Sequence, residues 1–125
     1  MNDNNQKLIT LITDDIILPD GQINYNRINL ISGAIALPIV RSLCETDTKD
    51  MEMVQKIHDT FSGLFYSGQY QELYDSIDEL YGSMGLQMTL AAISKNHEAL
   101  AYFVKSFLLD YEDIMEDYRI EKSVN

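Results

Sequence analysis

Residues 69–82 read QYQELYDSIDELYG, and this stretch decides the fold class. Large apolar or aromatic side chains recur in it every three or four residues, at Tyr70, Leu73, Tyr74, Ile77, Leu80 and Tyr81. The opposite side carries acids, at Glu72, Asp75, Asp78 and Glu79. A period of three to four residues is typical of an amphipathic helix with one face on a hydrophobic core. The stretch therefore predicts a helix that ends at Gly82.

The residues that precede this helix have similar spacing. We expect a first helix from Asn4 or Asn5 to about Leu18, followed by a turn at Pro19-Asp20-Gly21. A second helix is predicted over 25–43, where apolar residues lie nearly all the way round, so it should be buried on most sides. Pro38 should kink or split it. After a polar loop over 45–49, a third helix capped by Asp50 should stop at Gly68.

The residues that follow predict further helices. Ser83 can cap a helix that runs through Ile93, and its sequence MGLQMTLAAI carries no charge. A charge-free helix of this kind is usually central, with other helices around it. Asn96 can cap a sixth helix, and a last helix or bent extension should follow it up to frayed residues at 122–125.

These patterns together predict one all-α domain over residues 1–125, with about seven short helices around the charge-free one. The chain has 125 residues, 46% of them hydrophobic, which is enough for a core without disulfides or metals. We find no alternating strand pattern and no internal repeat. The fold class is therefore all-α.

The charge balance restricts the partners. The chain has 20 acidic and 9 basic residues, for a formal net charge of −11. Such a surface repels phosphate backbones and anionic lipid headgroups, so we expect neither nucleic-acid binding nor binding to a membrane surface. It attracts basic partners, although an acidic surface also serves solubility alone.

Compartment and chemistry follow from a few residues. The single cysteine, Cys44, indicates a reducing compartment, and neither a signal peptide nor a run of about 18 apolar residues is visible. Cys44, His58 and His97 have no spacing diagnostic of a nucleophile or metal site, so a buried thiol and a surface imidazole are the simpler interpretation. No calcium-binding or phosphate-binding loop occurs. We expect a cytoplasmic protein that is not an enzyme and has no cofactor or metal.

Aromatic residues of the third and fourth predicted helices have two interpretations. They either fill the core or line a groove that a ligand covers, and both remain open for Phe61, Phe65, Tyr70, Tyr74, Ile77 and Tyr81. The eight tyrosines suit a groove that is sometimes wet, and the six methionines let a surface adapt to its ligand.

The helix order resembles the Bcl-2 family of apoptosis regulators, especially its compact viral members. Residues 69–82 are similar to the family's fourth helix, and Phe61-Ser62-Gly63-Leu64 is similar to the Phe-Ser-x-Leu stretch ahead of it. Residues 5–21 look like the first helix, 84–93 like the buried central helix, and 101–111 like its partner, with Phe107-Leu108-Leu109 at the aromatic-Leu positions.

The chain also departs from the family pattern. The Asn-Trp-Gly-Arg signature is replaced by Ser83-Met84-Gly85-Leu86, so the arginine that pairs with the ligand's aspartate has no counterpart there. Its loss should narrow or weaken ligand choice. Residues 43–50 lack the family's third homology motif, and the usual C-terminal membrane anchor is absent. The missing third homology motif favours an inhibitor of cell death over a killer.

The resemblance implies a pro-survival protein of a large DNA virus. It would sequester the amphipathic death helix of a pro-apoptotic host protein such as Bim in a hydrophobic groove. It would act in the host cytoplasm, with recruitment to mitochondria through partners and with homodimers as an option. The implied groove residues are Val54, Ile57, Phe61, Phe65, Tyr70, Leu73, Tyr74, Ile77, Tyr81, Met84, Gly85 and Met88.

Two other functions stay open from the sequence. The first is an acidic decoy, such as a phage or bacterial antitoxin or immunity protein, whose charged faces bind a basic protein. Its binding should weaken steeply with salt, whereas binding in an apolar groove should not. The second is a helical dimer whose apolar stripe serves self-association only.

Overall fold

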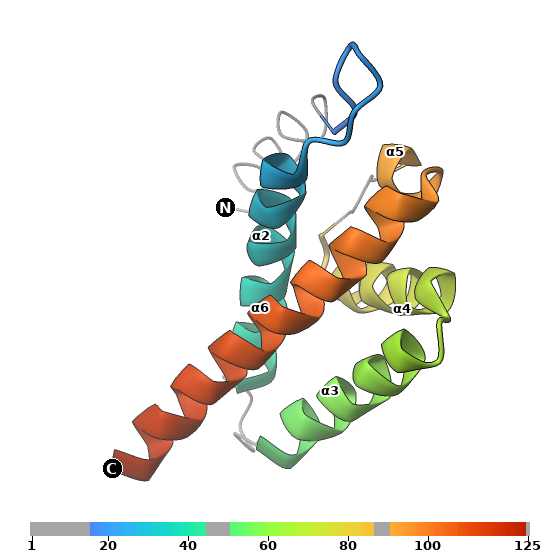
Figure 1. Ribbon diagram of the computed structural model, residues 1–125. Helices are drawn as coiled ribbons and strands as arrows, with labels where there is room; N and C mark the ends of the chain where they lie inside the picture. Colours follow the sequence, from blue (N-terminus) through green and yellow to red (C-terminus); the bar gives the residue numbers. More distant parts are fainter. Residues whose placement is uncertain (1–15, 45–50, 87–90, 125) are drawn as a thin grey trace.

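The computed structural model describes residues 16–44, 51–86 and 91–124, and these are almost entirely helical. The helices are α2 (Tyr25–Cys44), α3 (Met51–Tyr66), α4 (Tyr70–Ser83), α5 (Ala91–Ser94) and α6 (His97–Val124), shown in Figure 1. Within the described residues, β structure is limited to an isolated bridge between Ile17 and Ile23. The predicted all-α class is confirmed.

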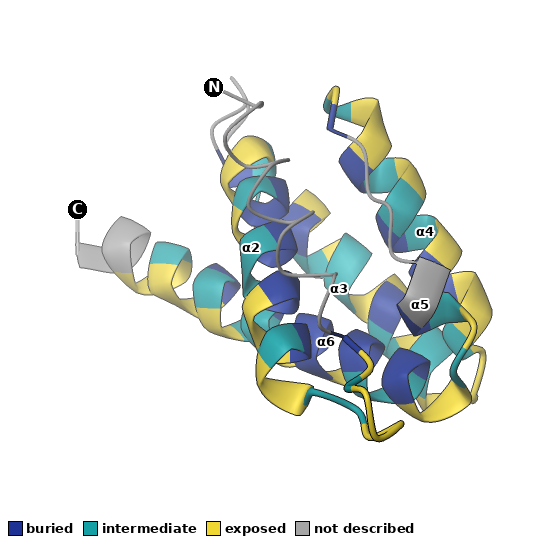
Figure 2. Cartoon of the chain, turned by 90° about the horizontal axis from the view of Figure 1, so that it is seen from above, coloured by how far each residue is buried: buried dark blue, intermediate teal, exposed yellow. Residues whose placement is uncertain are grey.

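α6 is the central helix of the described chain. It is 28 residues long and contacts α2, α3, α4 and α5. Figure 1 shows α6 running diagonally across α2, with α3 and α4 to the right of α2. Figure 2 shows the buried positions of the helices turned toward this shared interior. Fully buried aromatic side chains of α6 fill the interior, at Phe103, Phe107 and Tyr111.

The central helix is not the one that the sequence predicted. Residues 84–86, which should begin the charge-free helix, form a turn, and residues 87–90 lie outside the described part. Only the single turn α5 is helical there. α6 takes the central place because its apolar residues recur over many turns, so it can contact several helices at once.

Several helix ends follow the predicted chemistry. Gly68 has φ 78° and ends α3, and two hydrogen bonds close the turn, from Gly68 N to Phe65 O and from Gln69 N to Leu64 O. Asn96 caps α6, where its side-chain oxygen accepts a hydrogen bond from Ala99 N at 3.1 Å. Gly21, with φ 87°, completes the turn predicted at 19–21. The Asp50 cap and the 45–49 loop lie outside the described residues.

α2 bears on two predictions from the sequence. The sequence predicted a kink or a split at Pro38, and α2 continues past Pro38 as one helix, so it is not split. Ile35 and Ile39, on either side of the proline, are both fully buried in the core. α2 is also not buried on most sides. Eight of its residues are buried along one face, whereas Leu30 and Leu37 are exposed.

The two ends of the chain differ from the prediction as well. Most of the expected first helix lies outside the described residues, and its last part, Ile16–Leu18, is a bend and a bridge and not a helix. At the other end, one continuous α6 replaces the two expected elements and stays helical through Val124, so fraying from Lys122 is wrong. The described residues therefore hold five helical segments, against about seven predicted for the whole chain.

α2 is also long and apolar enough, by length and composition, to cross a membrane. A core helix of a water-soluble protein passes the same test, and 44% of the relevant α2 window is buried inside the structure. The feature is weak support for a membrane span.

Candidate functional site

The predicted groove residues divide into two groups, and the first lies in the core. Val54, Leu73, Ile77 and Tyr81 are fully buried, and Tyr74 is 8% exposed. Tyr74 packs edge-on against Phe103 of α6, with ring centroids 5.9 Å apart. Tyr74, Ile77 and Tyr81, for which both interpretations were open, therefore belong to the core, and so do Val54 and Leu73, which were predicted as groove residues.

Tyr81 has one further property. Its hydroxyl is buried and has no hydrogen-bond partner within the part of the chain that the structure describes. Burial raises the pKa of Tyr81 because the phenolate would lose its hydration.

The second group of predicted residues lines pockets or lies near the surface, although Phe61 is itself buried in the core at 4% exposure. Ile57 and Phe61 line a pocket between α3 and α4, whereas Phe65 and Tyr70 line a different pocket beside the start of α6. Met84 is partly buried against the core. Gly85 lies exposed in the turn after α4 with φ 82°, and Met88 is outside the described residues. The structure does not gather the eleven predicted residues that it describes into one pocket.

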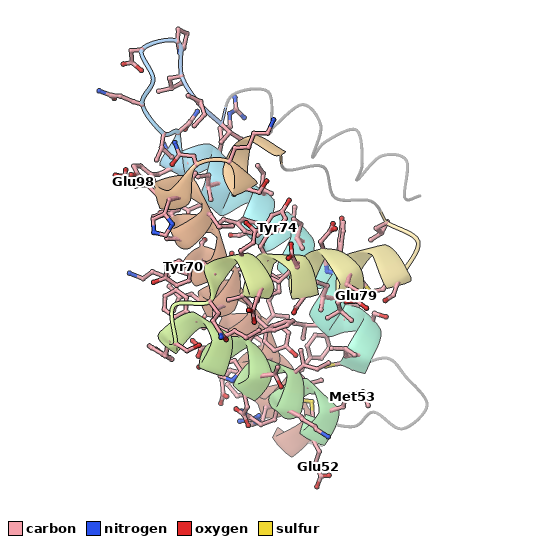
Figure 3. All side chains as sticks on the ribbon, turned by 90° about the vertical axis from the view of Figure 1, so that its right-hand side faces the viewer. Glu52, Met53, Tyr70, Tyr74, Glu79 and Glu98 are labelled. Carbon is pink, nitrogen blue, oxygen red and sulfur yellow. The ribbon has the colours of Figure 1, made fainter. Side chains whose placement is uncertain are left out.

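The α3–α4 pocket has a volume of about 400 Å³ and is mostly apolar. Its lining comes from Met53, Lys56, Ile57, Thr60 and Phe61 of α3 and from Ser76 and Leu80 of α4. Figure 3 shows this side of the molecule, with α3 and α4 in front and Met53 near the start of α3. Met53 is 52% exposed, so solvent reaches a hydrophobic surface here.

The pocket forms because each of the two helices has more apolar surface than the core covers. In α3 only Val54 and Phe61 are buried, seven residues apart on the side facing α6. Met53 and Ile57 are four residues apart on a neighbouring side, so they share a face on which Met53 is exposed and Ile57 is partly buried. Ser76 and Leu80 have the same spacing on α4. The two secondary faces meet and leave a hollow between them.

Three side-chain hydrogen bonds hold α3 along α6. The Tyr111 hydroxyl donates a hydrogen bond to Val54 O at 2.7 Å, and the Arg119 guanidinium donates one to Gln55 Oε1 at 2.6 Å. His58 Nε2 lies 2.7 Å from Glu112 Oε2, and since a carboxylate only accepts, the imidazole donates. The His58 side chain is 13% exposed, so it is not the surface imidazole that the sequence suggested.

Residues of catalytic or metal-binding type are engaged elsewhere. Cys44 is buried, with its Sγ 3.9 Å from Met51 Sδ, and His58 pairs with Glu112. Within the described ranges, no three His, Cys, Asp or Glu side chains converge as metal ligands would.

Charge near the α3–α4 pocket has an uneven distribution. Lys56 is the cation of the lining, and it has no ion pair among the described side chains. The outer side of α4 is acidic, and the pKa of Asp78 is raised, first by burial and then by the neighbouring Asp75. Hydrogen bonds from Gln55 and His58 lower the pKa of Asp59 on α3.

Sequence reasoning missed five residues of this pocket, namely Met53, Lys56, Thr60, Ser76 and Leu80. The strongest apolar period in each helix marks the face that packs on the core. Prediction from this period therefore selected mainly residues that are buried. The signal for the pocket was the weaker second period, Met53 with Ile57 and Ser76 with Leu80.

Fold and site together define an all-α protein with an apolar pocket on its helix surface. Comparison of the chain with models of protein families, with curated proteins and with solved structures finds no match.

Proposed function

We propose that the α3–α4 pocket binds apolar side chains of an amphipathic helix from a partner protein. The observation that supports this most directly is the solvent-open, largely apolar hollow of about 400 Å³ between α3 and α4. Helix-in-groove recognition needs such a surface, and the size suits a few anchoring side chains. Met53 adds a flexible wall that adapts to different anchors.

The chemistry of the lining specifies the partner further. A partner helix that places its apolar residues in the pocket would bring a flanking acid near Lys56, whose ammonium is free of an ion pair among the described residues. Such a pair favours an amphipathic helix with an acid beside its apolar stripe. Lys56 would then supply, from α3, the positive charge that Ser83-Met84-Gly85-Leu86 lacks.

This partner chemistry agrees with the resemblance to pro-survival Bcl-2-like proteins. We therefore propose an inhibitor, without enzymatic activity, that sequesters the death helix of a Bim-like host protein in the cytoplasm and reaches mitochondria through its partners. Viral origin, a bundle of about seven helices and a homodimeric state are parts of the same proposal.

The test is a titration of the protein with death-helix peptides of the Bim type. Met53→Asp places a charge in the pocket, and Leu109→Asp is its control, because the two side chains are 52% and 51% exposed and Leu109 lies on α6 outside the pocket. An acid in the first turn of α3 also interacts favourably with the helix dipole, so Met53→Asp should remain folded.

We expect Met53→Asp to weaken peptide binding by about tenfold or more, as loss of an interface anchor does, and Leu109→Asp to leave it unchanged. Circular dichroism and thermal unfolding check that both variants are folded. The proposal fails if no peptide of the panel binds the wild type, or if the two variants bind equally well.

The acidic decoy is a second candidate, and the outer side of α4 favours it. Glu72, Asp75 and Glu79 are exposed there, and the pKa of Asp78 is raised mainly by burial and further by the negative charge of Asp75. A basic protein bound to this side would lose affinity steeply between low and high salt. Charge reversal at Asp75 and Glu79 would abolish that binding and leave peptide binding in the α3–α4 pocket intact.

A further inference from the structure

A second pocket opens where four helices meet around the start of α6, and aromatic rings form its walls. We call it the aromatic pocket, and its volume is about 370 Å³. Each of the four helices contributes a ring: Tyr25 from α2, Phe65 from α3, Tyr70 from α4 and Tyr102 from α6. His97, at the start of α6, adds a fifth ring, with its centroid 6.0 Å from that of Tyr70. The Tyr25 and Tyr102 centroids are 4.6 Å apart, and those of Phe65 and Tyr70 are 5.4 Å apart. The rings thus form two groups that line one hollow, Tyr25 with Tyr102 and Phe65 with Tyr70 and His97.

A carboxylate faces the same space. Glu98 belongs to the lining, is exposed, and has no ion pair with any described side chain. Figure 3 shows Glu98 and Tyr70 on one side of the molecule, away from Met53 and Glu79. Ala101, three residues after Glu98 on α6, is small and leaves room beside it.

Two basic residues also line the aromatic pocket, His97 and Lys105, and the position of Lys105 leaves Glu98 available. Lys105 follows Glu98 by seven residues, which is about 10 Å along a helix axis. At physiological salt, exposed charges separated by about that distance are largely screened from one another. The Lys105 ammonium therefore does little to neutralise the Glu98 carboxylate.

These groups favour a cationic occupant. Aromatic ring faces attract a cation through their quadrupole, and a carboxylate adds a charge-assisted hydrogen bond. A neutral apolar occupant would strip water from the Glu98 carboxylate and give it no partner, which is unfavourable. An anion would meet Glu98 and the net charge of −11. Among biological cations, guanidinium fits best, because its planar group stacks on rings while its edge pairs with a carboxylate.

We propose that the aromatic pocket binds the guanidinium group of an arginine side chain presented by a partner protein. The pocket is open to solvent on the helix surface and has the size for one long side chain, which suits a residue carried by a polypeptide. The site is separate from the α3–α4 pocket, so its test stands whether or not a death helix binds there.

The experiment follows tyrosine ring signals of the full chain by NMR during titration with blocked Gly-Arg-Gly. The matched control ligand is the same peptide with citrulline, which keeps the shape of arginine and lacks its charge. Choline is the third probe. We expect saturable shifts of the Tyr25 and Tyr102 rings with the arginine peptide, and binding at least about tenfold weaker with citrulline and with choline.

Two variants locate the site. Glu98→Gln should weaken binding of the arginine peptide about three- to tenfold, and Tyr25→Leu should weaken it by a similar factor. Their controls are Glu79→Gln, an exposed acid on α4, and Tyr66→Leu, a ring 80% exposed that contacts Phe65 outside the pocket. Both controls should bind as the wild type does.

Three results would overturn the proposal. The first is the absence of saturable ring shifts with the arginine peptide. The second is equal affinity for the citrulline or choline probe, which would indicate an apolar pocket or a general cation site. The third is unchanged binding in folded Glu98→Gln and Tyr25→Leu, which would place the cation elsewhere.

Discussion

α2 and α3 both pack against α6, but they bury different shares of their residues. α2 has eight buried residues out of 20, whereas α3 has two out of 16. α2 thus packs its apolar face against the core, whereas Met53 and Ile57 of α3 lie toward the surface. The difference teaches that a helix held by few buried side chains can leave apolar surface for a partner.

Polar contacts differ between the two regions too. Between α2 and α6, the buried Ser32 hydroxyl lies 2.7 Å from both Ser106 Oγ and Asp110 Oδ2. Ser106 also donates to Asn29 Oδ1 at 2.9 Å. Between α3 and α6, the polar contacts are mostly partly exposed, as at His58 and Arg119. A shift of α2 along α6 would raise the free energy of the folded state, because the buried polar groups between these two helices would lose their hydrogen-bond partners.

The largest expected effect compares isoleucines of the two helices. Ile35→Ala in α2 should cost about 2–5 kcal/mol of unfolding free energy, because Ile35 is fully buried and leaves a cavity. Ile57→Ala in α3 should cost about 1 kcal/mol or less, because its site already faces the α3–α4 pocket. Urea unfolding measures both. Equal losses would contradict the contrast between α2 and α3.

The next effect concerns the buried polar network. Ser32→Ala should cost about 1–3 kcal/mol, because Ser106 and Asp110 lose a partner in a buried place. The control is Ser42→Ala, at an exposed serine of the same helix, with a change within about 0.5 kcal/mol. If Ser32→Ala matched its control in urea unfolding, the network would not hold α2 on α6.

A smaller effect is expected where α6 holds α3. Tyr111→Phe removes the hydroxyl that donates to Val54 O and should cost about 1 kcal/mol. Tyr118→Phe, at a partly buried ring of the same helix, is the control and should be near neutral. Hydrogen exchange should also speed up in α3 of Tyr111→Phe more than in α2. Uniform exchange across both helices would speak against a local tether.

The smallest effect is a pH dependence from Asp110. Burial raises the pKa of Asp110 above its ordinary value of 3.8, although the Ser32 hydrogen bond opposes this. The native state then holds the proton more tightly than the unfolded chain. The resulting stability is fully present below pH 3.8 and is lost as pH rises through the raised pKa.

Urea unfolding of the wild type and Asp110→Asn over about pH 3.5 to 7 tests this sign. The stability of the wild type relative to the variant should fall as pH rises. A difference that stays flat, or that grows with pH, would show that Asp110 is not protonated more readily in the folded state.

Several features were predictable from the sequence because they depend on neighbours in the chain. The helix at 69–82, the glycine stop at Gly68, the Asn96 cap and the turn at Pro19-Asp20-Gly21 each follow from local chemistry. The all-α class follows from the same period repeated along the chain. The proposed pockets were predictable in part, since Ile57, Phe61, Phe65 and Tyr70 do line them.

The sequence by itself therefore determined where most helices lie and which side of each is apolar. Only the tertiary structure decided that α6 is the centre, that Tyr74, Ile77 and Tyr81 are core, and that Met53 and Leu80 face a pocket. The physical reason is that periodicity identifies an apolar face, whereas the partner that covers it depends on contacts between residues far apart in the chain.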